Sequence, residues 1–367
     1  MMRAIYFITV SQDCTAHGLT EPAVGGAQRM RKETLADALP PTDAQTSRTA
    51  SAKSQRAALA AVSIFDEDWW LDASAPGAWD RARVEWDGVV VGDMAFHVRR
   101  RWGLTYIAMP HLTRSMSPRL CPPPAKAATR DMLNHTIVSE LVQKLPRYDR
   151  FERTLEPGCA SVQGFVHANL AVTHMYTFRS KPGDGPDTML PQMHQEARRA
   201  INKAQRECTI ERSTDLDRFI CLHRGSYGTG THVDYETLER IFAAALSRGQ
   251  IEILFARSGG PTDCAAMILL WDSTTLYTWL LARDRVQNHV GASSLLTFEA
   301  MKTAHRLGRV IDLDGYVTPA VGSFLAKFGL QPVVRPYVNG SSRVWQALRC
   351  VTGIARPARR DRHFRVA

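Results

Sequence analysis

The clearest pattern in the chain is a series of short apolar runs in its second half. Three of them follow closely on one another, at residues 251–256, 264–271 and 275–281. Continuous apolar stretches of this length predict strands that are buried on both faces. Apolar residues at helical spacing surround these runs and predict amphipathic helices. The predicted helices are 191–205, 216–227, 235–247 and 293–307, and a strand over 310–314, a helix ending near Lys327 and a closing strand from Val333 follow.

The first half shows the same order of elements. Residues 81–86 alternate between apolar and polar, Asp87-Gly88 predicts a hairpin turn, and a second strand returns from Val89. The later elements are a strand over 104–109, a helix over 129–145, a strand over 151–155, a short helix and a strand over 172–178. This repetition favours a tandem duplication of one α/β plan. Two unrelated α/β domains are the alternative.

Composition sets the limits of these units. Residues 180–187 hold Pro, Gly and Asp with no apolar residue, and they predict an exposed linker between domains at 61–180 and 188–340. Residues 1–60 have no apolar period for most of their length, so we expect a disordered leader. Residues 341–367 form a basic tail, with seven Arg and one Asp supplying +6 of the net charge of +10. Such a tail attracts phosphate-rich partners or is simply solvated.

Several classes of protein are disfavoured by what the chain lacks. Its seven Cys are scattered without a CxxC pair, which indicates a reducing compartment rather than a disulfide framework or a zinc site. Its twelve His show neither HxH nor HExxH spacing, so we expect no metal. No apolar run reaches the roughly 18 residues that a membrane span needs, and the short apolar start does not fit a signal peptide. We therefore expect a cytoplasmic protein.

Four motifs in order carry a family resemblance. They are Phe65-Asp-Glu-Asp-Trp69, Arg198-Arg199-Ala-Ile-Asn-Lys203-Ala, Asp312-Leu-Asp314-Gly315 and Phe324-Leu-Ala-Lys-Phe328-Gly329. With the order of elements, they resemble the FemAB-like or BioF2-like branch of the GNAT acyltransferases. The resemblance implies an α/β fold of two tandem GNAT-like domains, each with a mixed central sheet flanked by helices. It also implies transfer of an acyl or aminoacyl group to an amine-bearing small molecule or peptide.

Two features depart from that family. Leu325 stands where the last motif of the family has a Lys, which in the members that build peptidoglycan is implicated in handling the substrate. The turn from Gln287 to Ala292 keeps one glycine and one small residue of the phosphate-binding turn of GNAT enzymes, with different spacing. Acyl-CoA and aminoacyl-tRNA both stay open as co-substrates, with no tightly bound cofactor. The basic tail favours tRNA as a partner.

Two segments are candidates for binding the donor. Small residues at the start of the helix over 293–307 would let backbone N–H groups approach a phosphate; the alternative is an ordinary turn with a serine cap. The basic residues of the second motif would grip the same phosphate, or they form a solvated helix face. The candidates are Arg198, Arg199, Lys203, Gly291, Ala292 and Ser293.

Four residues are candidates for catalysis. Asp312 and Asp314 lie two residues apart on one side of their predicted strand, and Asp314 would take the proton of the attacking amine. Its alternative is to cap the next turn. His232 and Tyr235 lie in or beside a Gly-rich loop of the kind that often carries function.

The acceptor is expected near the third apolar strand and the strand end at Gly315. Tyr277 and Trp279 alternate there and would line a pocket, although aromatic residues on an inner strand are more often core. The missing side chain of Gly315 would let a substrate approach the backbone. Tyr316, directly after the third motif, and Lys327, within the fourth, complete this set. The sequence thus predicts an N-acyltransferase; a binding module on an inactive scaffold is the alternative.

Overall fold

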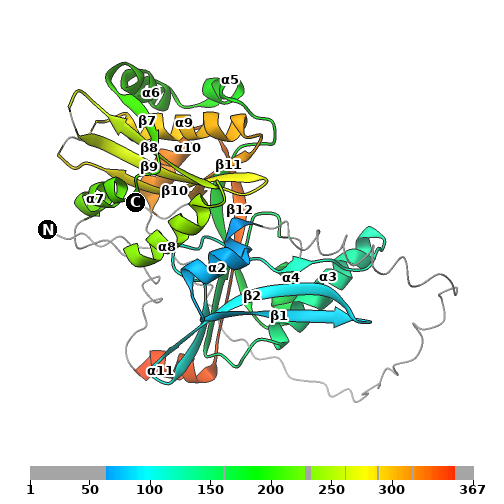
Figure 1. Ribbon diagram of the computed structural model, residues 1–367. Helices are drawn as coiled ribbons and strands as arrows, with labels where there is room; N and C mark the ends of the chain where they lie inside the picture. The colour runs from blue at the N-terminus through cyan, green and yellow to red at the C-terminus, as the bar shows by residue number, and fades with distance from the viewer. Residues whose placement is uncertain are drawn as a thin grey trace, which may run out of the picture. The chain divides into compact units, whose positions relative to one another are not determined.

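The structure is a computed structural model that describes residues 63–351, apart from 160–161, 228–232, 261, 287–288 and 316–317. The predicted leader, the tail beyond residue 351, and the candidates His232 and Tyr316 lie outside the described residues. The described strands form one continuous sheet with helices on its faces (Figure 1). This confirms the α/β fold class expected from the sequence.

In the described residues, the first half carries six strands and three α-helices. Its elements are η1 (Ile64–Asp66), α2 (Asp68–Ser74), β1 (Trp79–Trp86), β2 (Val89–Arg101), β3 (Leu104–Ala108), β4 (Arg119–Leu120), α3 (Ala127–Gln143), β5 (Arg150–Thr154), α4 (Val162–His167) and β6 (Ala171–Arg179). The turn between β1 and β2 has φ angles of 52° at Asp87 and 75° at Gly88. Two positive φ values in succession are typical of the type I′ hairpin turn that an Asp-Gly pair favours.

The second half adds six strands and the remaining helices. They are α5 (Pro186–Met189), η2 (Leu190–Gln192), α6 (Gln195–Glu207), β7 (Thr209–Ser213), α7 (Leu216–Tyr227), α8 (Tyr235–Leu246), β8 (Ile251–Arg257), β9 (Asp263–Trp271), β10 (Thr275–Arg283), α9 (Ala292–Arg306), β11 (Val310–Gly315), α10 (Pro319–Ala326), β12 (Gln331–Ser341) and α11 (Arg343–Val351). None of the helices in the described part of the chain is long and apolar enough to cross a membrane.

The two halves exchange their closing strands. The strand order is β1-β2-β3-β5-β12-β6-β11-β10-β9-β8-β7, with β4 beside β2. The last strand of the first half, β6, pairs with β11 of the second half, while β12 returns to pair with β5. β12 and β6 also pair with each other over nine residues, Gln331 to Asn339. The halves are therefore joined by hydrogen-bonded strands as well as by the segment between them.

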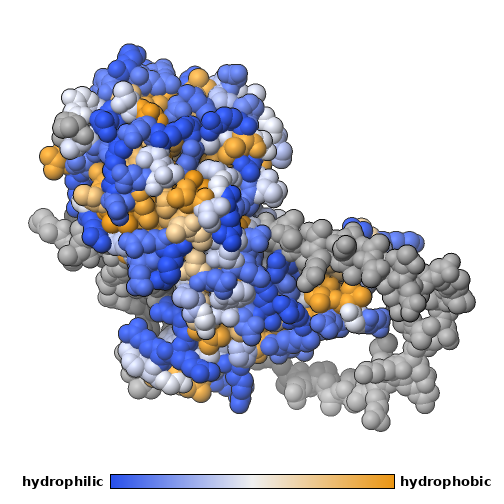
Figure 2. Space-filling view, viewed as in Figure 1, coloured by the Kyte–Doolittle hydropathy of each residue, from blue (hydrophilic) through white to orange (hydrophobic). Residues whose placement is uncertain are grey.

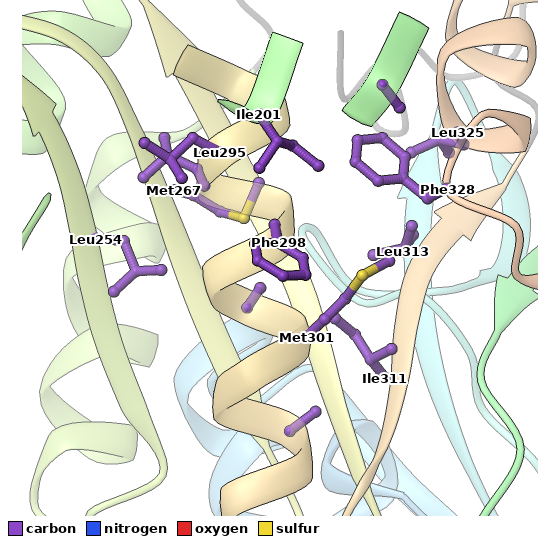
Figure 3. Close-up of a cluster of buried hydrophobic side chains, with 14 of the residues drawn as sticks. Ile201, Leu254, Met267, Leu295, Phe298, Met301, Ile311, Leu313, Leu325 and Phe328 are labelled. Atoms are coloured by element: carbon purple, nitrogen blue, oxygen red, sulfur yellow. The ribbon is translucent and has the colours of Figure 1, made fainter. Parts of the chain in front are cut away.

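Apolar layers cover both faces of the second half's sheet, which explains its continuous apolar runs. Along β9, Met267 and Leu269 belong to one cluster of buried side chains, whereas Ala266 and Ile268 belong to another. The first cluster lies under α6, α9 and α10, where Phe298 and other side chains converge (Figure 3). The second is covered by α2, α7 and α8. A third cluster packs α3 and α4 on the strands of the first half.

Candidate active site

The sheet opens between β10 and β11. These strands pair in parallel only from Thr275 with Val310 to Tyr277 with Asp312. On its other side, β10 shifts register against β9 between Thr278 and Leu280, which is a β-bulge. Bulges bend the strand that carries them and are frequent beside active sites.

A cavity of about 250 Å³ occupies the region of this opening, between β10, β11, α9 and α10. Most of its lining is apolar and comes from Met267, Leu280, Leu281, Leu313, Ala320, Val321, Phe324 and Leu325. Leu325, at the position where the resembling family has a Lys, is only 7% exposed and forms part of this wall. The cavity therefore fits an uncharged, flexible ligand segment better than a charged one.

A few polar groups interrupt the apolar lining. Thr278, Arg283, Ser293, Thr297 and Asp314 contribute to the wall. Asp314 adopts a φ of 71°, in the left-handed region that Asp tolerates better than bulkier residues. Its N–H donates to the Oδ1 of Asp312 at 2.7 Å, which fixes the strand end.

Behind the cavity wall, Asp314 belongs to a buried ion cluster. Its Oδ1 lies 2.9 Å from Nη1 of Arg335, and its Oδ2 lies 3.5 Å from Nε of Arg114. Asp312 lies 2.6 Å from Nε of Arg179 and 3.1 Å from Nη2 of Arg335. Both aspartates therefore serve as counter-ions for buried arginines.

Asp312 has no exposed surface and also accepts a hydrogen bond from Thr177 Oγ1 at 2.5 Å. Burial raises the pKa of Asp312, but the cations of Arg179, Arg335 and Arg114 outweigh it and hold the pKa well below its usual range. The expectation that Asp312 acts in catalysis is corrected here, because a fully enclosed, paired carboxylate does not reach a substrate. Asp314 remains a candidate, since it lines the cavity.

Arg114 links the first half of the chain to this site. Its Nη2 donates to the carbonyl oxygens of Thr278 and Trp279, the two residues at the β10 bulge. The residue is 2% exposed, and its Nε and Nη1 have no hydrogen-bond partner among the described residues. Arg114, a residue of the first half, thus holds the cavity wall through two contacts with β10 and one with Asp314.

The first turn of α9 meets α6 at one end of the opening. A Cβ on Gly291 would lie 2.3 Å from the carbonyl oxygen of Ala200, so only glycine allows this approach. His289 bridges the same two elements, with its Nε2 2.8 Å from Glu207 and its Nδ1 accepting from the N–H of Gly291 at 3.2 Å. Gly291 and Ala292 are buried, and Ser293 is the member of this turn that reaches the cavity.

The basic candidates on α6 are exposed. Arg198, Arg199 and Lys203 all point away from the buried face formed by Ala197, Ile201 and Ala204. Lys203 lies 4.0 Å from Glu207 in an exposed pair, which is worth little energetically. Ala200 and Ala204 of α6 lie against Gly291 at the start of α9. Arg199 and Lys203 each directly precede one of these alanines, so both lie close to that turn.

Three acceptor candidates have structural roles, and one of them also lines the cavity. Tyr277 and Trp279 are each 1% exposed and lie in the cluster on the face opposite α9, with ring centroids 4.9 Å from Phe65 and 5.4 Å from Trp70, respectively. The expectation that they line the pocket is corrected, because strand alternation turns them into the core. Gly315 does line the cavity, but a Cβ there would lie 1.9 Å from the carbonyl oxygen of Tyr176. The absence of a side chain at Gly315 therefore lets β6 pack closely against β11 and does not make room for a substrate.

Two further candidates lie outside the cavity lining. The Tyr235 hydroxyl lies 2.9 Å from Nδ1 of His223, and Asp234 caps α8 by accepting from the N–H of Glu236 at 3.2 Å. Lys327 forms an ion pair with Glu196 that ties the end of α10 to the start of α6. The structure thus assembles Asp314, Gly315 and Ser293 at one cavity and places Tyr235 and Lys327 elsewhere.

Sequence reasoning missed Arg114, Arg335 and Arg283. Arg283 ends β10 and is an exposed cation at the cavity. The two buried arginines carry no local signal, because each pairs with residues distant in the chain. Across the residues that the structure describes, no group of three His, Cys, Asp or Glu is placed to hold a metal ion.

Comparison with known proteins identifies the region around the cavity. Residues 191–316 match the family model of the acetyltransferase (GNAT) domain. The crystal structure of FemX is similar with a TM-score of 0.58 at 14% identity, over 82% of this chain and 98% of the other. No protein of curated function matches the chain.

Two more solved structures share the fold. The C-terminal domain of a putative lysylphosphatidylglycerol synthetase from Agrobacterium fabrum has a TM-score of 0.50 at 12% identity, over 83% of this chain and 97% of that one. L-PGS from Bacillus licheniformis has a TM-score of 0.50 at 11% identity, over 82% and 95%. At these identities the similarity establishes the fold and leaves the substrates open.

Proposed function

From the premise that the chain carries a GNAT acyltransferase domain, we propose that it transfers an acyl group from a phosphopantetheine thioester, such as acyl-CoA, to an amine. The observation that carries this proposal is the mostly apolar cavity between β10 and β11, which reaches from Ser293 at the start of α9 to Asp314 and Gly315. A pantetheine arm is flexible and uncharged, which suits such a wall. A cytoplasmic location is part of the proposal.

The phosphate end of the donor would lie at the first turn of α9. Helix N-termini present unsatisfied N–H groups and partial positive charge to an anion. Arg199 and Lys203 on α6, together with Arg198, would add full charges beside that turn. In this arrangement Gly291 lets α9 pack against α6, and the side chain of Ser293 contacts the donor.

The reaction would proceed by direct attack. The amine nitrogen forms a bond to the thioester carbon, the resulting oxyanion collapses, and the carbon–sulfur bond breaks. The amine loses a proton, and the leaving thiolate gains one. Asp314 is the carboxylate on the cavity wall, and we assign it the role of accepting a hydrogen bond from the incoming amine. Its ion pairs with Arg335 and Arg114 hold it in place for that contact.

Aminoacyl-tRNA is the second candidate donor. It is favoured by the basic residues after 341 and by the departure of the α9 turn from the usual phosphate-binding pattern. The cavity argues against it. An aminoacyl donor brings a cationic ammonium group, which the mostly apolar wall of the cavity does not stabilise.

Binding of CoA by calorimetry tests the donor assignment. We expect CoA to bind the wild type, and the pair Arg199→Gln with Lys203→Gln to bind it more weakly, by about 0.2–1 kcal/mol for each exposed charge removed. The exposed cations Arg83 and Arg130, on the first half, provide a matched control when both are changed to Gln. Tight binding of tRNA with no affinity for CoA would favour the second donor. Binding of neither would favour a non-enzymatic module.

A further inference from the structure

At one end of the strands of the first half's sheet, basic and apolar side chains lie on a surface that has no role in the proposed transfer reaction. The row Arg99, Tyr106, Arg150 and Ser341 pairs across β2, β3, β5 and β12. Beyond this row lie the β2–β3 turn and α11, which lie together in Figure 1. We call this surface the basic edge and define it by Arg100, Arg101, Trp102, Arg343, Val344 and Leu348.

Trp102 stands at the tip of the β2–β3 turn with 80% of its surface exposed. Its φ of 52° lies in the left-handed region, which a bulky aromatic residue rarely occupies. The guanidinium of Arg101 lies 4.0 Å from the centroid of its ring. An exposed indole at a strained turn is therefore a candidate for contact with a partner.

The described contacts of α11 fix one side of the helix to the sheet. The hydroxyl of Ser342 accepts from the N–H of Trp345 at 3.1 Å and donates to Asp149 at 2.9 Å. The Trp345 ring lies 5.5 Å from that of Tyr106, and the guanidinium of Arg150 lies 5.3 Å from its centroid. These contacts fix the helix to the sheet, yet Val344 and Leu348 remain 57% and 43% exposed on its outer side.

The charges of this edge point outward with little opposition. Arg100, Arg101 and Arg343 are exposed. The nearby acidic groups are engaged internally: Asp149 accepts from the N–H of Thr105 at 2.9 Å, and Glu152 pairs with Arg150. Figure 2 shows a mainly hydrophilic surface at this lower end of the molecule, with small apolar areas. The sequence continues from α11 into a segment with five more Arg.

We propose that the basic edge docks the protein on the surface of an anionic lipid bilayer. An amphipathic helix with apolar side chains beside arginines is suited to lie in the interface plane. An exposed tryptophan prefers the headgroup level, and arginines are attracted to anionic lipid. Aliphatic Val344 and Leu348 favour a bilayer over a nucleic acid, because aliphatic side chains do not stack on bases as aromatic ones do.

Co-sedimentation with vesicles tests this proposal on the full chain. We expect binding to phosphatidylcholine vesicles that contain phosphatidylglycerol, weakened by salt, and little binding to phosphatidylcholine alone. Arg100→Ala with Arg101→Ala should weaken it by roughly 25-fold, at about fivefold for each Arg. Trp102→Ala, and separately Val344→Ser with Leu348→Ser, should weaken it as well. The control, Arg83→Ala with Arg130→Ala, removes the same charge away from this edge and should bind much more tightly than the first variant.

Circular dichroism and thermal melting verify that each variant is folded. Absence of binding to anionic vesicles at low salt would overturn the proposal. So would an equal loss in the control variant, which would mean that net charge alone drives binding. Binding of tRNA or self-association that the same substitutions abolish, without vesicle binding, would reassign the edge to that partner and overturn the bilayer. None of these outcomes depends on which acyl donor the second half takes.

Discussion

At the scale of single residues, the cavity wall depends on ions that are buried and paired. Asp314 lines the cavity while it neutralises Arg335 and Arg114 behind the wall. Removing its charge therefore does two things at once. It alters the group that faces the ligand, and it leaves the buried guanidinium of Arg114 without its ion pair and that of Arg335 with Asp312 alone.

We expect Asp314→Asn to lower the free energy of unfolding by about 3–5 kcal/mol, because breaking one partner of a buried ion pair leaves an uncompensated charge. Urea denaturation measures this loss. The double variant with Arg335→Gln should lose less than the sum of the two single changes. An unchanged stability would mean that solvent reaches the cluster and that Asp314 is a freer carboxylate than its contacts indicate.

Asp66 is a second buried carboxylate with a measurable signature. Burial raises its pKa from 3.8 to about 7, against the lowering effects of the Ser117 N–H and Arg153. Between these values the folded state binds a proton that the unfolded chain releases, so the stability from this group falls as the pH rises to about 7. Asp66→Asn should flatten that part of the profile. Equal slopes for both proteins in pH-dependent unfolding would refute this assignment.

At the scale of elements, the opening between β10 and β11 depends on close backbone contacts from other parts of the chain. Arg114 holds the carbonyl oxygens at the β10 bulge, and Gly315 lets β6 lie directly against β11. The geometry of the cavity is therefore a property of several elements and not of the GNAT strands alone.

Gly315→Ala should destabilise the protein by about 1–3 kcal/mol, since the new methyl group meets the carbonyl oxygen of Tyr176. Thermal unfolding provides the measurement. Gly225 on α7 has open space at its Cβ position, and Gly225→Ala is the matched control that should not destabilise. If both substitutions had the same effect, the close approach of β6 would not constrain position 315.

The local pattern predicted most elements within a few residues. The three apolar runs became β8, β9 and β10, and the predicted helix over 216–227 is α7. β7 was missed because Thr209 to Ser213 is a mainly polar strand at the end of the sheet, with no apolar run to mark it. The site was harder to predict. The roles of Tyr277 and Trp279 depend on which sheet face α9 covers, and Arg114 reaches its partners across more than 160 positions.

At the scale of the whole molecule, the exchanged strands join the two halves into one sheet. β12 lies between β5 and β6, so the first half contains a strand from the end of the described chain. The segment 180–187 remains the predicted linker; Lys181, Pro182 and Gly183 are exposed, whereas Ser180 and Gly185 are buried. Local sequence patterns did not predict this exchange, because the residues of a strand do not show which distant strand it pairs with.

Limited proteolysis should cut first within 181–183, the exposed residues between β6 and α5. The two fragments should nevertheless stay together in size-exclusion chromatography, because β6 and β12 each pair with the other fragment. They should separate only in denaturant. Fragments that part under native conditions would show that the strand exchange contributes little to holding the halves together.

The central claim is that the cavity between β10 and β11 receives the acyl donor. Its most direct test is mass-spectrometric detection of an acylated amine after incubation with acyl-CoA, comparing the wild type with Val321→Trp, which fills the cavity. Ser323→Trp places the same side chain on the exposed side of α10 as a control. We expect transfer by the wild type and the control, and loss of transfer in a folded Val321→Trp protein. Equal transfer by all three proteins, or by none, would contradict the account.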